Sequence, residues 1–310
     1  MSAAAAIEIR GLTKSFGTVR AVDSLDLTVK KGEVFGFLGP NGAGKTTTIK
    51  MILGLTRPEA GSVLIEGESL ARKPHEIKRR IGYLPERVAF YDNLTALQTL
   101  EFYADIKGAP HDALESLLVS VGLGEFARKR VGTFSKGMRQ LLGVAQAFIG
   151  EPSILIMDEP TSGLDPNWAR KVKDRVAEAS RKGVTVFFSS HMLSEVEELA
   201  SRVAILNRGK TVAEDTVAKL RSSLELKPRM YLTLDGDSVA AGKAAEGVAG
   251  VGQIFWDGKS LIVESSPESK VKILMAIENA GVAVKDLRTA EPSLEEVFLR
   301  MTESAQGAIR

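Results

Sequence analysis

Short uncharged runs, rich in β-branched and aromatic residues, recur along the chain and are typical of buried strands. They lie at residues 34–38, 154–157, 184–188 and 203–206. Helix-like segments at 167–181 and 193–200 separate the last three runs. Because strands joined by crossover helices run parallel, this alternation predicts an α/β fold built on a parallel sheet.

Shorter segments of apolar or alternating character predict an antiparallel part of a mixed sheet and further strands after it. They lie at residues 7–9, 19–22, 25–29, 63–65 and 81–84. The basic stretch 72–80 fits either a solvated helix face or a contact with anionic lipid or a partner.

From about residue 91 to 150 the pattern becomes helical. Thr95 and Gln98 form a capping box that opens this segment. Apolar residues then recur at helical spacing, at Leu97, Leu100, Phe102 and Ile106. We therefore expect a helical insertion within the α/β domain.

A second pattern starts after residues 226–228, which are typical of a linker. Its expected elements follow the order β-α-β-β-α-β, at residues 230–234, 239–248, 251–256, 261–263, 267–280 and 282–287. This order is that of the split ferredoxin-like unit, an α+β domain. A last helix, 293–301, is expected to open at a capping box of Ser293 and Glu296. The sequence thus predicts two domains, 1–225 and 228–310.

Composition limits the possible classes of protein. The 310 residues carry 41 basic and 39 acidic side chains, a net charge of +2, which disfavours nucleic acid as the main partner. With no cysteine there are neither disulfides nor thiolate metal sites, and a reducing cytoplasm is compatible. No window holds the roughly 18 apolar residues of a membrane-spanning helix, and residues 1–6 lack the features of a secretory signal. We expect a soluble chain.

The segment after the first buried run fits the phosphate-loop spacing G-x-x-x-x-G-K-[ST]. Its candidate nucleotide-binding residues are Gly39, Asn41, Gly42, Ala43, Gly44, Lys45, Thr46 and the following Thr47. Glycines let successive backbone N–H groups point at one anion, and the start of a helix adds partial positive charge. Lys45 is expected to reach the terminal phosphates, and the Thr46 hydroxyl to bind Mg²⁺.

Two carboxylates, Asp158 and Glu159, follow the buried run 154–157, at the end of a strand where parallel sheets bind ligands. Asp158 is suited to hold Mg²⁺ through its water shell, and Glu159 to polarise the water that attacks a phosphate. Adjacent acids also occur in ordinary turns. Their pairing with a phosphate loop in one domain favours the chemical interpretation.

Four further segments identify a resemblance. They are Ile-Gly-Tyr-Leu-Pro-Glu at 81–86, Phe-Ser-Lys-Gly-Met-Arg-Gln at 134–140, Ser-Gly-Leu-Asp at 162–165 and Ser-Ser-His at 189–191. With the phosphate loop and the acidic strand end, they resemble the ATP-binding-cassette ATPases over about residues 7 to 222. The resemblance implies ATP and Mg²⁺ as ligands and ATP hydrolysis as the activity.

The resemblance also implies roles for single residues. Phe16 matches the position that stacks on adenine, although a core phenylalanine is the plain alternative. Ser135 and Gly137 match the signature loop, which caps the terminal phosphate bound by a second copy in a head-to-tail homodimer. Asp165 matches the loop that crosses that interface. His191 matches the histidine that holds the terminal phosphate and orients the attacking water.

Two positions depart from the pattern of the family. Glu86 stands where a glutamine usually contacts the magnesium–water network and senses the membrane partner; a carboxylate can still bind Mg²⁺ but adds negative charge. Lys136 stands where the signature usually has glycine, and either adds a cation near the opposite phosphate or points to solvent. Glu86 and residues 291–299 resemble the export-type branch of drug-efflux and antibiotic-resistance ATPases.

The leading hypothesis is the ATPase subunit of an exporter, cytoplasmic and held at the inner face of the cell membrane by a separate transmembrane permease. The alternative is a soluble cassette ATPase acting on nucleic acid or ribosomes; such proteins usually carry two cassettes or a long coiled-coil insertion. A non-hydrolysing module is disfavoured because Lys45, Asp158, Glu159 and His191 are all present. A GTPase is disfavoured because no Asn-Lys-x-Asp motif occurs. The carboxyl-terminal domain is expected to regulate or to stabilise the dimer, and the transported substrate stays open.

Overall fold

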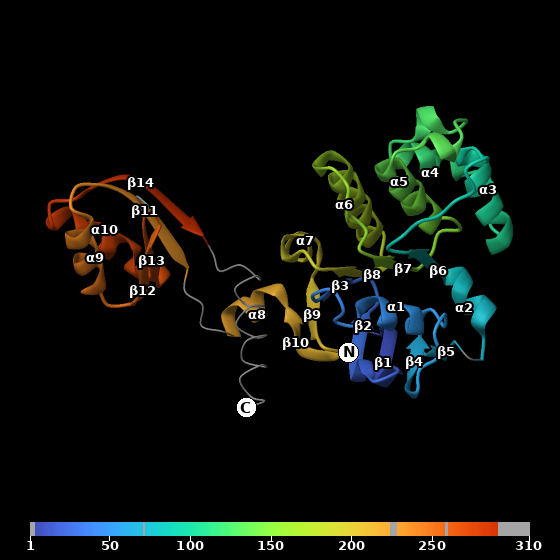
Figure 1. The fold of residues 1–310 in the computed structure, drawn as a ribbon, viewed down its shortest axis with the longest axis horizontal. Helices are drawn as coiled ribbons and strands as arrows, with labels where there is room; N and C mark the ends of the chain where they lie inside the picture. Colours follow the sequence, from blue (N-terminus) through green and yellow to red (C-terminus); the bar gives the residue numbers. More distant parts are fainter. Residues whose placement is uncertain (1–3, 71, 224–227, 258–259, 291–310) are drawn as a thin grey trace. The chain divides into compact units, whose positions relative to one another are not determined.

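The structure is a computed structural model that describes residues 4–70, 72–223, 228–257 and 260–290 (Figure 1). The chain divides into two compact units, with the division after Val217. The first unit holds both predicted sheets and the helical insertion. The second unit holds the carboxyl-terminal elements.

A six-stranded sheet forms the centre of the first unit, in the order β10-β9-β3-β8-β7-β6. Its strands are β3 (Val34–Leu38), β6 (Ile81–Leu84), β7 (Ile154–Asp158), β8 (Thr185–Ser190), β9 (Arg202–Asn207) and β10 (Lys210–Thr216). All pairs are parallel except β9 with β10. Every residue of β3, β7 and β8 is buried, as expected of strands covered on both faces. The predicted parallel α/β sheet is confirmed.

Helices connect and cover this sheet. They are α1 (Lys45–Ile52), α2 (Pro74–Arg80), α6 (Pro166–Arg181) and α7 (Leu193–Leu199). The ring of Phe187 on β8 stacks on Phe35, with centroids 5.9 Å apart, and lies 5.1 Å from the ring of Phe37. These aromatic rings fix the lateral packing of β3 against β8 in the core.

The antiparallel sheet has the order β2-β1-β4-β5. Its strands are β1 (Ala5–Phe16), β2 (Val19–Lys30), β4 (Ala60–Ile65) and β5 (Glu68–Ser69). The sequence predicted short separate strands here, whereas β1 and β2 are long and continuous. Shifts of register between them, near Leu12 and Lys14, interrupt the alternation that reveals a strand in a sequence. Ser24, with φ 50°, lies at the same irregularity.

The helical insertion consists of α3 (Ala96–Lys107), α4 (Leu114–Ser120) and α5 (Lys136–Ala147), which gather at one end of the first unit in Figure 1. The capping box of α3 is confirmed: Thr95 Oγ1 accepts from Gln98 N at 3.2 Å, and Gln98 Oε1 from Thr95 N at 3.0 Å. Small residues such as Ala104 face the interior of the insertion. Phe102 and Ile106 are exposed instead.

The basic stretch forms α2, of which only Ile77 is buried. Lys73 lies 3.5 Å from both Glu68 and Glu76, and Arg80 pairs with Glu66 at 3.1 Å. The charges of Lys73 and Arg80 are thus neutralised within the chain, and a single buried residue agrees with a solvated helix face. No helix among the described residues is long and apolar enough to cross a membrane.

The second unit has a four-stranded antiparallel sheet in the order β12-β13-β11-β14. Its elements are β11 (Arg229–Asp235), α9 (Ser238–Glu246), β12 (Val251–Asp257), β13 (Ser260–Ser265), α10 (Lys270–Asn279) and β14 (Ala283–Ala290). Apolar side chains of α9, α10 and the sheet form its own core. The helix expected at 293–301, with Ser293 and Glu296, lies outside the described residues.

Lys107, at the end of α3, links this helix to the segment that follows α5. Its Nζ donates a 2.6 Å hydrogen bond to the Ile149 carbonyl beyond α5. Burial lowers the pKa of Lys107 from 10.5 to about 8. The folded chain therefore binds fewer protons than the unfolded chain between pH 8 and 10.5, so this residue's contribution to stability rises with pH across that window.

We predict that the free energy of unfolding of wild type increases relative to that of Lys107→Met by about 1–2 kcal/mol from pH 8 to 10.5, after allowance for partial exposure. Urea titrations of both proteins across this range measure the difference. Lys78→Met, which removes an exposed lysine of α2, is the matched control. Parallel pH profiles of wild type and Lys107→Met would contradict the prediction.

Candidate nucleotide-binding site

A cleft of about 460 Å³ opens where β3 and β7 end and β8 passes into the loop before α7. Its lining residues are Ala21, Pro40, Asn41, Gly42, Gly44, Lys45, Thr46, Thr47, Glu86, Glu159, Ser162 and His191. The structure therefore brings the predicted phosphate loop, one acid of the strand end, Glu86 and His191 into one site. These residues come from segments far apart in the sequence.

The phosphate loop joins β3 to α1, and at Gly44 it has space only for glycine. Gly44 precedes α1 with φ 106°, and a Cβ there would lie 2.3 Å from the Ala21 carbonyl oxygen. Lys45, 6% exposed, folds back and donates to the carbonyl oxygens of Gly39 at 2.6 Å and Pro40 at 3.4 Å. The lysine therefore lies inside the curve of its own loop.

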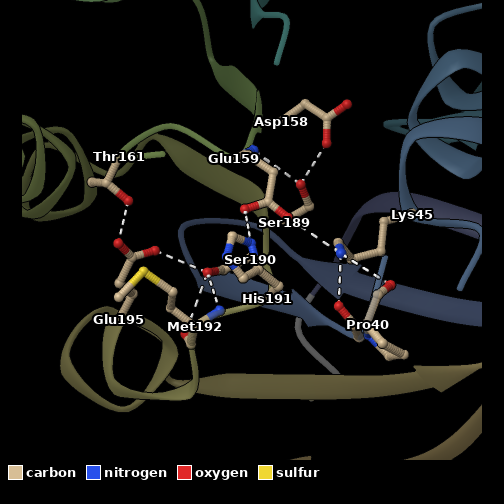
Figure 2. A network of polar contacts seen from close by, with 11 residues as sticks. Pro40, Lys45, Asp158, Glu159, Thr161, Ser189, Ser190, His191, Met192 and Glu195 are labelled. Atoms are coloured by element: carbon tan, nitrogen blue, oxygen red, sulfur yellow. Dashed lines mark hydrogen bonds and ion pairs between the residues drawn. The ribbon is translucent and has the colours of Figure 1, made fainter. Parts of the chain in front are cut away.

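The chain turns sharply after β7. Asp158 is fully buried at the strand end, and Glu159 has φ 51°, a left-handed conformation that is unfavourable for any residue but glycine. Ser189 on β8 holds this turn: its Oγ accepts from Glu159 N at 3.0 Å and donates to Asp158 Oδ1 at 2.5 Å. The turn directs the Glu159 carboxylate toward the phosphate loop (Figure 2).

Both oxygens of Glu159 have a partner. Oε1 lies 3.2 Å from Lys45 Nζ, and Oε2 lies 2.7 Å from His191 Nδ1. A carboxylate can only accept a hydrogen bond, so Nδ1 of His191 carries a proton and donates a hydrogen bond to Glu159. The other ring nitrogen, Nε2, makes no contact with Glu159. The network thus holds a nearly buried carboxylate between a cation and an oriented imidazole.

A second set of polar contacts involves the two chain neighbours of His191, Ser190 and Met192 (Figure 2). Thr161 Oγ1 donates to Glu195 Oε1, Ser190 Oγ donates to Glu195 Oε2 at 2.8 Å, and Met192 N donates to Ser190 Oγ at 2.9 Å. Glu195 is only 6% exposed. Sequence reasoning missed Glu195 and Thr161. The available signal was an acid in the first turn of α7, four residues after His191, but its burial depends on the fold.

The residues near Asp158 fit a magnesium ion. Asp158 Oδ2 is buried and has no hydrogen-bond partner within the described part of the chain. Burial raises the pKa of Tyr83 to about 12, and the charges of Asp158 and Glu86 add to the rise. These two acids therefore concentrate negative charge near Tyr83.

Mg²⁺ needs only one or two protein ligands beside phosphates and waters. Among the described residues there is no cluster of three acids or histidines. The Thr46 hydroxyl and Asp158 are suited to hold an ion that arrives with a nucleotide.

Phe16 ends β1 and is 55% exposed, with Lys14 Nζ 5.4 Å from its ring centroid. It is not a core residue, and it does not belong to the residues that line the cleft. Its stacking on adenine stays a prediction.

Ser135, Gly137 and Asp165 lie outside the lining of the cleft. Ser135 caps α5 through Met138 N at 3.2 Å, and Asp165 caps α6 through Asn167 N and Trp168 N, at 3.0 and 3.1 Å. A cleft in one chain therefore lacks the residues predicted to cap its phosphate.

A phosphate loop at the end of a parallel strand, facing an acidic strand end, defines a P-loop nucleotide-binding protein. Comparisons with known proteins narrow this class. The sequence pattern of the ABC transporter family matches residues 22–162. The chain is 37% identical over 297 residues to the bacitracin transport ATP-binding protein BcrA of Bacillus licheniformis, covering 95% of this chain and 96% of BcrA.

Other relatives have similar extent. The linearmycin resistance ATP-binding protein LnrL of Bacillus subtilis is 33% identical, covering 96% of this chain and 98% of LnrL. The daunorubicin/doxorubicin resistance ATP-binding protein DrrA of Streptomyces peucetius is 33% identical, and the match covers 96% of this chain and 92% of DrrA.

Solved structures agree. An ATP-binding subunit of an ABC transporter matches with TM-score 0.66 and 32% identity, covering 71% of this chain and 93% of that chain. A nucleotide-free ATP-binding cassette matches with TM-score 0.63 and 24% identity and shows the same fold. The match covers 71% of this chain and 95% of that cassette. The chain belongs to the ABC transporter ATP-binding proteins and is an ATPase. The resemblance seen in the sequence, including the drug-resistance branch, is confirmed.

The cap at Asp165 yields a prediction about stability. Asp165→Ala removes the acceptor for two backbone N–H groups and is expected to lower the free energy of unfolding by about 1 kcal/mol. Asp165→Asn, which keeps an acceptor oxygen, is expected to stay within a few tenths of a kcal/mol of wild type. Urea unfolding of the three proteins measures this. Equal losses for Ala and Asn would show that the cap is not the stabilising contact.

Proposed function

We propose that this chain is the ATP-hydrolysing subunit of an exporter, binding ATP and Mg²⁺ in the cleft and working as a head-to-tail homodimer with a separate membrane permease. The observation that carries the hydrolytic part is the network of Lys45, Glu159 and His191. It joins a phosphate-binding cation, a candidate base and an imidazole within hydrogen-bond distance.

The network explains how nucleotide entry makes the base available. In this structure the Lys45 ammonium forms an ion pair with one carboxylate oxygen of Glu159, Oε1. Two unit charges at their separation of 3.2 Å attract by about 5 kcal/mol at an effective dielectric constant of about 20. A triphosphate carries several negative charges and draws the ammonium away. Glu159 Oε1 is then free to accept a proton from water.

The other contacts keep the base oriented during this exchange. His191 holds Oε2 through Nδ1, so the carboxylate does not rotate when Lys45 leaves. Its Nε2 is then available to the terminal phosphate. When bound, Mg²⁺ neutralises charge on the phosphate oxygens. Thr46 and Asp158 are the residues that would hold it, with Glu86 nearby.

The homodimer is supported by what the cleft lacks. Ser135, Gly137 and Asp165 are placed at helix starts outside the cleft, so they are available to a nucleotide held by another copy. Two chains related head to tail would each complete the other's site.

The permease contact is supported by an exposed apolar surface on the insertion. Tyr91, Phe102 and Ile106 are 62%, 39% and 68% exposed, and the rings of Tyr91 and Phe102 meet edge to face at 5.8 Å. An exposed apolar patch marks an interaction site. Tyr91 lies five residues beyond Glu86, which lines the cleft, so a partner bound at this surface would be joined to the cleft by a short segment. We propose that the permease holds the protein on the cytoplasmic side of the membrane.

The names of the relatives indicate the class of cargo. BcrA, LnrL and DrrA are named for bacitracin, linearmycin and daunorubicin. We therefore propose export of an antibiotic. No observation on this chain favours the alternative of action on nucleic acid or ribosomes. For the second unit we propose a regulatory or dimer-stabilising role.

Glu159→Gln is the test of the hydrolytic assignment. It removes the base but keeps the shape of the side chain, so we expect ATP hydrolysis to fall about 100-fold or more. ATP binding should remain, and the variant should elute as a stable dimer with ATP in size-exclusion chromatography. Glu115→Gln, an exposed acid of α4, is the control and should hydrolyse ATP normally. If Glu159→Gln hydrolyses ATP at the wild-type rate, Glu159 is not the base.

A further inference from the structure

Glu195 is a buried acid in the first turn of α7 whose hydrogen-bond partners are hydroxyl groups. Its Oε1 accepts from Thr161 Oγ1, and its Oε2 accepts from Ser190 Oγ at 2.8 Å. Among the described residues, no lysine, arginine or histidine forms an ion pair with it. A buried carboxylate without a cation costs the fold more free energy than an apolar side chain of similar size. This cost indicates a task for Glu195 beyond stability.

The two hydrogen bonds of Glu195 reach the two loops that carry the candidate base and the histidine (Figure 2). Thr161 follows Glu159 by two residues, and Ser190 directly precedes His191. Inside the cleft, the same two loops meet through the 2.7 Å hydrogen bond from His191 Nδ1 to Glu159 Oε2. These contacts form a closed ring, and Glu195 is a member that lies outside the lining of the cleft.

Two side-chain contacts hold the backbone that follows Glu159. Glu159 has φ 51°, a conformation that persists only where the surrounding structure imposes it. Gln140 of α5 donates from Nε2 to the Pro160 carbonyl oxygen at 3.2 Å, and Thr161 donates to Glu195. Of these two contacts, the one through Glu195 continues to the loop that carries the histidine.

We infer that Glu195 is a positioning residue for hydrolysis, which keeps the Glu159 carboxylate and the His191 imidazole at hydrogen-bond distance while a nucleotide binds. The inference rests on the roles proposed for Glu159 and His191. Once Lys45 has left Glu159 for the phosphates, the imidazole is the remaining partner of the carboxylate. The separation of the two loops then determines whether the base stays aimed at the attacking water. A misplacement of about 1 Å costs about 100-fold in rate.

Five single substitutions in the full chain test this role. Glu195→Ala removes both hydrogen bonds. Thr161→Val removes one of them and keeps the shape of the side chain, and Thr161→Ser, which keeps the hydroxyl, is its control. Should Glu195→Ala fail to fold, the pair at Thr161 decides, because it leaves Glu195 in place. Glu198→Ala is the matched control for the loss of an acid from α7, since Glu198 is exposed and lies outside the lining of the cleft.

Glu195→Gln is the conservative variant and is expected to keep the ring of contacts. Its amide oxygen accepts from Thr161, and its amide nitrogen donates to Ser190 Oγ. The Ser190 hydroxyl then donates to the Met192 carbonyl oxygen, which lies 3.3 Å away.

We expect kcat for ATP hydrolysis to fall about 30-fold or more in Glu195→Ala and about 10-fold in Thr161→Val. Glu195→Gln, Thr161→Ser and Glu198→Ala should stay within about 3-fold of wild type. KM for ATP and the affinity for a fluorescent ATP analogue should change less than about 3-fold in every variant, because the altered side chains lie outside the lining of the cleft. Rates are measured well below each melting temperature. An acid that only stabilises the fold would lower the melting temperature and leave kcat of the folded chain unchanged.

The orientation of His191 has a spectroscopic readout of its own. The chain has three histidines, so a long-range proton–nitrogen NMR spectrum of histidine-labelled protein resolves each ring, and His191→Gln identifies the signals. In nucleotide-free wild type and Glu195→Gln we expect the tautomer protonated at Nδ1, because Nδ1 donates to Glu159. In Glu195→Ala we expect a mixture of both tautomers, with the signals of the other histidines unchanged.

The outcomes separate this inference from the proposed function. If Glu159→Gln is inactive while Glu195→Ala and Thr161→Val keep the kcat of wild type, Glu195 is not a positioning residue and the proposed hydrolytic site stands. Equal losses of kcat in Glu195→Gln and Glu195→Ala would also overturn the role, since the amide keeps the hydrogen bonds. If Glu159→Gln and His191→Gln both keep full activity, the proposed site is wrong and the role of Glu195 is overturned with it.

Discussion

The buried ion pair between Lys45 and Glu159 is the interaction on which the site depends. Both side chains are less than one tenth exposed, so each charge has lost most of its hydration and needs the other. Carbonyl oxygens of the phosphate loop complete the environment of the ammonium, and His191 completes that of the carboxylate. Removing either charge would leave the other buried and uncompensated. In the nucleotide-free cleft, the carboxylate of the candidate base therefore compensates the charge of the phosphate-binding lysine.

The central sheet makes this pair possible. The last residues of three neighbouring strands set its geometry: Leu38 of β3 pairs with Ser190 of β8, and Asp158 of β7 pairs with Ser189. A shift of one residue in either pairing would reverse the faces of these side chains. The stacked phenylalanine rings in the core oppose such a shift. The apolar core thus determines the distances between charged groups that belong to three separate segments.

Much of this could be predicted from the sequence, because the relevant signals are local. The phosphate loop is a continuous segment, and Asp158 and Glu159 directly follow an apolar run. Glu195 could not be predicted as a buried residue, since nothing within α7 distinguishes it from solvated acids nearby. The same holds for the exposed Phe102: helical spacing reveals a helix, but which face is buried depends on the helices that pack against it. In β1 and β2, shifts of register interrupted the alternating pattern, so long strands resembled short ones.

Lys45 and Lys136 show how burial changes what a lysine can do. Lys45 is enclosed and already paired with Glu159, so a nucleotide must displace a carboxylate to reach it. Lys136 is exposed and unpaired within the described residues. In the proposed mechanism, a phosphate that enters the cleft releases the base of the same chain, whereas the segment around Lys136 takes part only when a second copy is present. Nucleotide binding to one chain and closure of the proposed dimer would then be separable events.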